Sequence, residues 1–403
     1  MHSSSVPLLL AARALRGFAD GYVAILLPAY LLALGFGTWE VGVLSTTTLL
    51  GSALMTLAVG AMGHRFHHRL LLTSAALLMA ATGFAFALVG GAAGTLFWPL
   101  LLIAFIGTLN PSSGDVSVFL PLEHARLAEA SDASSRTALF ARYSLVGAMF
   151  AALGALATSL PAHLSTAMDA SQFRGIQAMF ALYGLIGCIV FLLYRTMPPP
   201  VAGEAIVSTA PLGPSRSVVV RLATLFSVDS FAGGLVVNSL LALWLFERFG
   251  LSLAETGHFF WLSGLAGAAS QLAAPVLARR IGLVNTMVFT HIPASLFLIG
   301  AACSPRLDLA LGLLLMRSLM SQMDVPARSA LVMTLVTPGE RAAAASFTTV
   351  PRSLAAALSP ALGGALFAAG WLAAPLILCG ALKIGYDLVL WRGFRRAEAN
   401  ASQ

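Results

Sequence analysis

The chain has 403 residues, of which 58% are hydrophobic and only 10% are charged, with a mean hydropathy of +0.88. Soluble domains carry about 25% charged residues, so this chain has too few charges to cover a water-facing surface of its size. The composition therefore excludes a soluble globular protein and makes the lipid bilayer the expected surroundings. The net charge of +7 is typical of arginine-rich cytoplasmic loops, and we expect no nucleic acid partner.

Apolar stretches of about 20 residues, the length that a helix needs to cross a membrane, recur along the chain. Apolar residues run continuously and do not alternate with polar ones, which excludes a membrane barrel and predicts an all-α membrane protein. Twelve transmembrane helices are predicted, over residues 14–35, 41–63, 70–91, 96–122, 137–160, 174–195, 217–246, 255–278, 284–303, 308–333, 342–369 and 371–391.

The stretch between the sixth and seventh helices is rich in Pro, Gly and Ser. Because proline cannot continue a helix, this stretch predicts a cytoplasmic linker over 196–216, between six-helix bundles over 1–195 and 217–403. With the N-terminus in the cytoplasm, only Arg174, Arg248 and Arg306 fall on the far side of the membrane. We therefore expect both termini to be cytoplasmic in a multi-pass protein, and the short loops favour a bacterial plasma membrane.

Charged residues recur in the two halves at a nearly constant distance. The matching pairs are Asp20 and Asp229, Asp115 and Asp324, both 209 positions apart, Arg142 and Arg352, 210 apart, and Glu40 and Glu255, 215 apart. Several landmarks in one register indicate two six-helix repeats, an arrangement that is common among transporters.

A short motif follows the second helix and returns after the eighth. The first copy runs from Gly60 through His64 and Arg65 to Arg69, and the second includes Arg280 and Gly282. Over essentially the whole chain, the six-plus-six pattern with these loops resembles the major facilitator family, whose loop reads roughly Gly-x-Leu-Ala-Asp-Arg-x-Gly-Arg-Arg. This chain departs from the family by placing His64 where the loop aspartate belongs.

The resemblance implies that helices 1, 4, 7 and 10 surround a central cavity. Four of the eight aspartates fall one on each of these helices: Asp20, Asp115, Asp229 and Asp324. A charged side chain at the centre of a membrane helix costs at least ~2.5 kcal/mol, so each should face the cavity or a partner. Asp20 and Asp115 are predicted to meet Arg142, and Asp229 and Asp324 to meet Arg328 and Arg352.

These pairs have two interpretations. They are predicted first as a gate that closes the cytoplasmic mouth of the cavity, and second as sites that bind a proton or a cationic substrate. The two roles can coexist, because an aspartate whose arginine partner changes can take up and release a proton. Arg317 has no acidic match in helix 4, so it predicts either an anionic substrate or a structural partner.

Other residues complete the predicted site. Candidate substrate contacts on the cavity helices are Tyr22, Tyr30, Asn110, Asn238 and Trp261. The Asn110-Pro111 and Asp324-Val-Pro326 segments are expected to loosen helices 4 and 10. Lys383 and Asp387, four residues apart on helix 12, predict a structural ion pair, and His291 is expected to be an isolated, satisfied side chain.

The sequence contains no zinc-protease or phosphate-loop motif and no supported catalytic triad, so we expect no enzyme, no resident metal and no cofactor. A channel or a scaffold has less need of charges on every cavity helix. The prediction is a monomeric secondary transporter with protons and a small molecule as partners, working in proton-coupled efflux of an organic compound. The alternative is uptake of a small organic anion or a metal ion.

Overall fold

The computed structural model describes residues 5–62, 66–89, 96–112, 117–129, 133–167, 169, 171–198 and 213–401, and within them all regular structure is helical. The chain divides into two compact units. Unit 1 comprises 1–203 with 237–261, and unit 2 comprises 204–236 with 262–403. Residues 237–261 therefore pack with the first unit, although their place in the sequence puts them in the second six-helix repeat.

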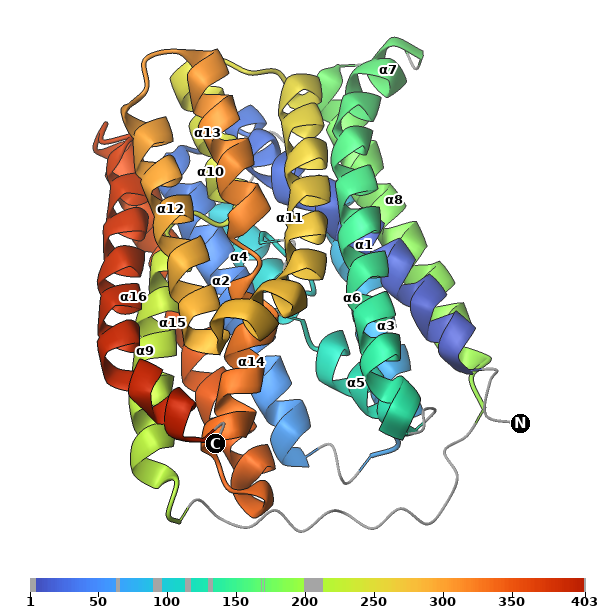
Figure 1. The fold of residues 1–403 in the computed structure, drawn as a ribbon. Helices are drawn as coiled ribbons and strands as arrows, with labels where there is room; N and C mark the ends of the chain where they lie inside the picture. Colours follow the sequence, from blue (N-terminus) through green and yellow to red (C-terminus); the bar gives the residue numbers. More distant parts are fainter. Residues whose placement is uncertain are drawn as a thin grey trace. The chain divides into compact units, whose positions relative to one another are not determined.

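The described part of unit 1 is built mainly from nine α-helices (Figure 1). They are α1 (Ser5–Ala33), α2 (Thr38–Met62), α3 (His68–Val89), α4 (Phe97–Ile106), α5 (Phe119–Glu129), α6 (Ala133–Leu156), α7 (Leu160–Ala167), α8 (Gln172–Arg195) and α10 (Asn238–Phe249), with a 3₁₀ turn at Ala157–Ser159. The short α10 is tied to its unit by two contacts of Ser239. Its hydroxyl lies 3.0 Å from that of Ser45, and its N–H donates to the Pro111 carbonyl at 3.0 Å.

Unit 2 contains the remaining helices. They are α9 (Arg216–Gly234), α12 (Leu283–Cys303), α13 (Leu307–Met320), α14 (Asp324–Leu335), α15 (Arg341–Ala368) and α16 (Ala374–Ala401), with a 3₁₀ turn at Pro338–Glu340. The long α11 (Leu253–Ile281) begins in unit 1 and ends in unit 2.

Nine helical stretches in the described residues are long and apolar enough to cross a membrane. The stretches predicted at 96–122, 308–333 and 342–369 are not among them. The stretches at 96–122 and 308–333 are each interrupted, so neither piece is long enough to cross a membrane alone. The Asn110-Pro111 and Asp324-Val-Pro326 segments predicted that these two helices would be loosened.

The interruptions have local causes. Helix 4 ends at Ile106, a few residues before Pro111, and helix 10 is split between Met320 and Asp324. Pro326 falls in the first turn of α14, where a missing N–H costs nothing. A third break, over 235–237 between α9 and α10, follows two glycines and was not predicted.

The two units repeat the same helix pairings. In unit 1, α1 packs along α6 and α3 along α8, and in unit 2, α9 packs along α15 and α12 along α16 (Figure 1). Glycine permits the close approach, because a Cβ on Gly21 would lie 2.0 Å from the Ala151 carbonyl oxygen. Likewise, a Cβ on Gly234 would lie 2.4 Å from the Ala356 carbonyl oxygen. Small residues at such crossings are typical of membrane helices.

Helix starts also repeat. Glu40 in the first turn of α2 accepts the Gly37 N–H at 2.9 Å, and Glu255 in the first turn of α11 accepts the Ser252 N–H at 2.8 Å. Each carboxylate thus satisfies a backbone donor that the helix leaves free, which is half of a capping box.

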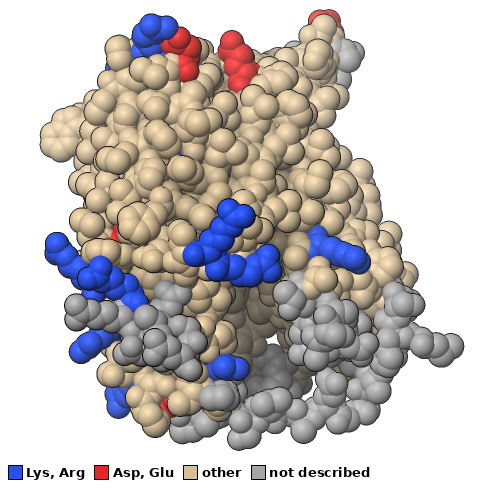
Figure 2. All heavy atoms as spheres, in the orientation of Figure 1, with Lys and Arg blue, Asp and Glu red and all other residues tan. Residues whose placement is uncertain are grey.

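The surface in Figure 2 is mostly uncharged, with Lys and Arg side chains gathered toward its lower part. Large apolar side chains stand on the outside of the described helices, among them Leu88 at 79% exposed and Trp98 at 77%. Exposed apolar area of this kind is expected where lipid replaces water.

Candidate functional site

Among the described residues, the largest group of buried charges lies inside unit 2, where four helices each contribute side chains. Its members are Asp229 on α9, His291 on α12, Asp324 and Arg328 on α14, and Lys383 and Asp387 on α16. We call these six residues the unit 2 cluster. All except Lys383 are buried, and the Lys383 side chain is 13% exposed.

Asp229 holds the unit 2 cluster together. Its Oδ1 accepts from Lys383 Nζ at 2.6 Å, and its Oδ2 lies 3.2 Å from Arg328 Nη2. Arg328 also donates to Asp324, one helical turn away on α14, and its guanidinium lies 5.5 Å from the Phe226 ring centroid. Two anions and two cations therefore neutralise each other where an unpaired charge is expensive.

His291 stands between the two charged residues of α16. Its Nε2 lies 3.3 Å from Lys383 Nζ, and its Nδ1 lies 3.3 Å from Oδ1 and 3.2 Å from Oδ2 of Asp387. No direct Lys383–Asp387 ion pair forms among the described residues, because Lys383 reaches across to Asp229. The predicted pair along helix 12 is therefore wrong, and His291 is not isolated.

Unit 1 buries a different group, centred on Glu123 of α5. Its carboxylate accepts hydrogen bonds from Arg16, from Tyr143 and, at 2.6 Å, from Tyr194. The Arg16 guanidinium stacks 4.1 Å from the Phe119 ring centroid. Glu123 is 0% exposed and Arg16 is 2% exposed, so Glu123, Arg16, Tyr143 and Tyr194 form a closed unit 1 cluster.

Asp20 lies beside the unit 1 cluster without being enclosed by it. It is half-buried, interacts with the charges of Arg16 and Arg13, and is hydrogen-bonded to the Asn110 side chain. Asn110 is fixed in turn, because its Oδ1 accepts from the Ser112 N–H at 3.1 Å and the Ser112 hydroxyl at 2.8 Å. The break in helix 4 thus supplies an amide donor to the carboxylate of helix 1.

The structure places the other predicted charges as follows. Arg142 is exposed on α6, and the partners of Asp20 are the arginines of its own helix, so the predicted Asp20–Arg142 meeting is wrong. Asp115 lies outside the described residues. Arg352 is half-buried on α15, and its charge interacts with Tyr386. Arg317 is half-buried on α13, and its charge interacts with Cys379 and His291.

The two predicted tyrosine contacts are core residues instead. Tyr22 and Tyr30 are 0% exposed, and their hydroxyls donate to the carbonyls of Met179 at 3.2 Å and Phe86 at 2.7 Å. Asn238, at the start of α10, and Trp261, on α11, are half-buried in unit 1.

The signature loops are partly described. Gly60 lies in the last turn of α2 with open space where a Cβ would stand, Arg65 lies outside the described residues, and Arg69 donates to the Arg195 carbonyl. Arg280 is exposed near the end of α11. Gly282 starts α12 at a φ of 89°, a conformation that favours glycine, so this motif position has a structural reason.

Sequence reasoning missed Arg16, Glu123, Tyr143, Tyr194 and His291. Glu123 follows the predicted end of helix 4 by one residue, and Arg16 resembles an ordinary cytoplasmic flank. The sequence did hold a signal for this pair, because Glu123 and Arg16 lie near the ends of two predicted cavity helices and could have been considered as ion-pair partners. Among the described residues no group of three or more His, Cys, Asp or Glu is placed to hold a metal ion.

Known proteins with the same fold are transporters and membrane proteins. The family model described as Major Facilitator Superfamily matches residues 9–320. The uncharacterized membrane protein YJR124C of Saccharomyces cerevisiae is 23% identical over 435 residues, covering 96% of this chain and 93% of that protein.

Two solved structures show how far the similarity extends. A D-xylose–proton symporter matches with a TM-score of 0.75 at 16% identity, over 96% of this chain and 98% of that one. A mutant of the nucleoside transporter NupG matches with a TM-score of 0.74 at 15% identity, over 97% and 100%. Identities this low show the shared fold.

Proposed function

The chain belongs to the major facilitator superfamily, and we propose that it is a secondary active transporter that exports a small organic compound in exchange for protons. The observation that carries the proposal is the pair of acidic sites inside membrane helices, Asp20 in unit 1 and Asp229 in unit 2. Asp20 is held by two arginines of its own helix and by Asn110, and Asp229 by side chains of α14 and α16, and the proposal requires that these surroundings change during the transport cycle.

Exchange follows from the chemistry of Asp20. It is half-buried, and its partners are one amide and two arginines of its own helix. A carboxylate at such a position binds either a proton or the cationic group of a substrate, and the two exclude each other. Mutual exclusion makes transport an exchange, and an inward proton gradient then drives the compound outward.

The structural neighbours support small polar organic compounds as the substrate class. One neighbour is a D-xylose–proton symporter and another is a nucleoside transporter. The first also supports protons as the coupling ion. Both of these are proposals for this chain, since the similarity itself concerns the fold.

The alternative of anion uptake rested on Arg317. Its charge interacts with Cys379 and His291 within unit 2, and neither a thiol nor a neutral imidazole neutralises an arginine. Uptake of a small organic anion at Arg317 therefore stays the second candidate function, while export of a neutral or cationic compound rests on Asp20.

Transport in proteoliposomes tests the proposal, with a compound chosen by its thermal stabilisation of the purified protein. A pH gradient should drive its movement in the wild type, and Asp20→Asn should abolish that movement while counterflow persists. Asp308→Asn, whose side chain is 66% exposed, is the matched control and should behave as wild type. Wild-type transport that ignores the pH gradient would contradict proton coupling, and full activity of Asp20→Asn would exclude Asp20 as the coupling residue.

A further inference from the structure

The hydrogen bonds around His291 determine where its proton sits. Lys383 has three donors and no acceptor, so the nitrogen it contacts at 3.3 Å, Nε2, must accept. A neutral imidazole carries one proton, which is therefore on Nδ1 and is donated to Asp387 at 3.3 Å. The structure thus shows His291 as a neutral acceptor for a lysine, with an aspartate behind it.

Adding a proton to Nε2 would change this arrangement. Nε2–H and the Lys383 ammonium would then be two donors facing each other, and neither could accept. The nearest acceptor for Nε2–H is Oδ1 of Asp229, 3.9 Å away, the same oxygen that Lys383 occupies at 2.6 Å. A protonated His291 and Lys383 therefore compete for one carboxylate oxygen.

We propose that the His291–Asp387 pair is a proton-binding site, and that loading it weakens the Lys383–Asp229 link between α16 and α9. As a second coupling site beside Asp20 it rests on the function proposed above, while as a proton-binding site it stands on its own geometry. The ligand is the proton, and the contact it weakens joins α16 to α9, which keeps its ion pair with Arg328 of α14.

A second observation points to the same pair. Asp387 is 0% exposed, and among the described residues its carboxylate has one donor, His291 Nδ1–H, which lies 3.3 Å from Oδ1 and 3.2 Å from Oδ2, so one of the two oxygens, Oδ2 if Oδ1 accepts, is left without a hydrogen bond. A buried carboxylate oxygen without a donor carries a desolvation cost that a proton removes. The pair therefore offers two neighbouring places for one proton, Nε2 of His291 and Oδ2 of Asp387.

The charges around His291 are balanced. Every helix packed against it contributes: Asp229 from α9, Arg317 from α13, Asp324 and Arg328 from α14, and Lys383, Asp387, Tyr386 and Cys379 from α16. With neutral His291, three carboxylates face three cations. One added proton creates a net positive charge, and the Lys383 ammonium, on the most exposed side chain of the cluster, can relieve it by moving away from Asp229.

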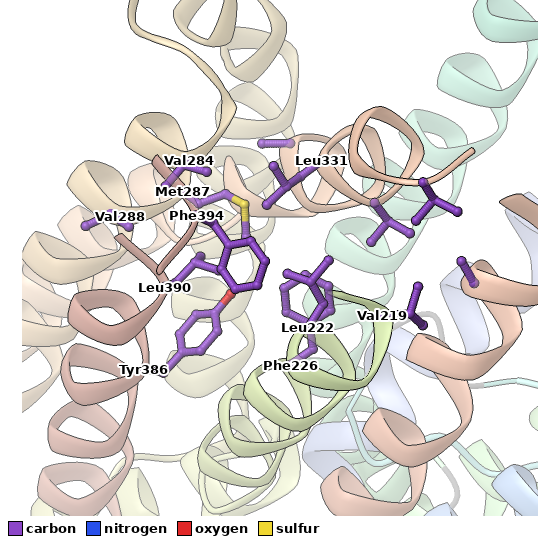
Figure 3. Close-up of a cluster of buried hydrophobic side chains, with 14 residues drawn as sticks. Val219, Leu222, Phe226, Val284, Met287, Val288, Leu331, Tyr386, Leu390 and Phe394 are labelled. Carbon is purple, nitrogen blue, oxygen red and sulfur yellow. The ribbon is translucent and has the colours of Figure 1, made fainter. Parts of the chain in front are cut away.

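A cluster of buried apolar side chains, drawn in Figure 3, lies one helical turn from the charged residues. Phe226, Val288, Leu331 and Leu390 lie three residues along their helices from Asp229, His291, Arg328 and Asp387, respectively. All four belong to one hydrophobic cluster and are at most 2% exposed. This cluster excludes water on its side, so protons reach the pair from the side of Lys383 and do not leak through the bundle.

Nuclear magnetic resonance of the full chain in lipid nanodiscs, labelled with ¹⁵N-histidine, tests the site directly between pH 4.5 and 9. His291→Gln identifies the signal, and His258→Gln, an exposed histidine on α11, is the matched control. In the wild type the His291 signal should shift within this range as the His291–Asp387 pair takes up a proton. Asp387→Asn should move the midpoint to lower pH and Lys383→Met to higher pH, each by about tenfold in proton affinity or more.

A His291 signal that does not titrate, or one with the same midpoint in all variants, overturns the inference. If His291→Gln fails to fold, Asp387→Asn and Lys383→Met still give the opposite shifts that the proposal requires. Proteoliposome transport separates the two claims. If Asp387→Asn keeps full transport driven by a pH gradient, coupling at this site is overturned and the proposed function stands. If the wild type shows no such transport, the proposed function is overturned, and the titration alone decides whether the pair binds a proton.

Discussion

The two units bury charge in different ways. In the unit 1 cluster a single carboxylate, Glu123, receives three donors and has no alternative partner. In the unit 2 cluster three carboxylates share an arginine, a lysine and a histidine, and Asp229 Oδ1 is within reach of two of them. Closed networks hold helices together, whereas shared acceptors allow partners to exchange.

The difference rests on a common plan with reversed charges. Unit 1 takes its arginine from α1 and its acid from α5, and unit 2 takes its acid from α9 and its arginine from α14. In both, the guanidinium lies against a phenylalanine of the helix that carries its acidic partner, Phe119 for Arg16 and Phe226 for Arg328. Both units therefore place an ion pair between corresponding helices of the repeat, but the helix that carries the arginine in one unit carries the acid in the other.

The largest effect is expected from Glu123→Gln. The change leaves Arg16, which is 2% exposed, without its counter-charge, and breaking a buried pair typically costs about 3–5 kcal/mol. Unfolding of the purified protein by a denaturing detergent measures the loss. Adding Arg16→Gln should recover a large part of it, because the uncompensated charge is then gone. Wild-type stability of the single variant would contradict a closed network.

A matched pair of tyrosines sharpens the contrast. Tyr194 donates to Glu123 at 2.6 Å, whereas the Tyr386 hydroxyl, in unit 2, has no hydrogen-bond partner among the described residues. Tyr194→Phe should cost about 1.5–3 kcal/mol, the range for a hydrogen bond to a charged group. Tyr386→Phe should cost nothing or stabilise. Equal losses in the same unfolding assay would mean that the two hydroxyls are equally bonded.

Much of this contrast between the two clusters could not be predicted from the sequence. The length of the apolar stretches predicts the helices. The constant offset between the two halves predicts that Asp229, Asp324 and Arg328 form one group, because residues at fixed spacing on a helix keep their relative positions. The Glu123–Arg16 pair spans 107 positions, and the face that α12 turns toward α16 depends on packing at Gly380, not on periodicity. The break after Gly234 was missed because glycines are also common in unbroken membrane helices.

Glu340 provides a reference for a carboxylate fixed by neutral donors alone. Hydrogen bonds from Ser215, the Gly213 N–H and the Thr337 hydroxyl lower the pKa of Glu340 to about 2. The unfolded value is about 4.3, so the ionised group stabilises the fold above that pH, and its contribution is lost as the pH falls toward 2.

Thermal unfolding at several pH values checks this. The wild type should exceed Glu340→Gln most at pH 7, and the gap should narrow between pH 5 and pH 3. Glu247→Gln, at an exposed glutamate of α10, is the control and should show no such narrowing. A gap that stays constant with pH would show that the Glu340 charge is not what stabilises the fold.

Among the substitutions of buried carboxylates, the smallest effect on stability is expected from Asp387→Asn. The asparagine oxygen can still accept from His291 Nδ1, and Lys383 keeps Asp229, so no buried cation loses its partner. The loss should be roughly 1 kcal/mol or less, near the net value of one ordinary hydrogen bond. A carboxylate whose neutralisation lowers the free energy of unfolding so little contributes little to the stability of the fold, in contrast to Glu123. A loss as large as that of Glu123→Gln would place Asp387 with the closed networks and remove the distinction between the two units.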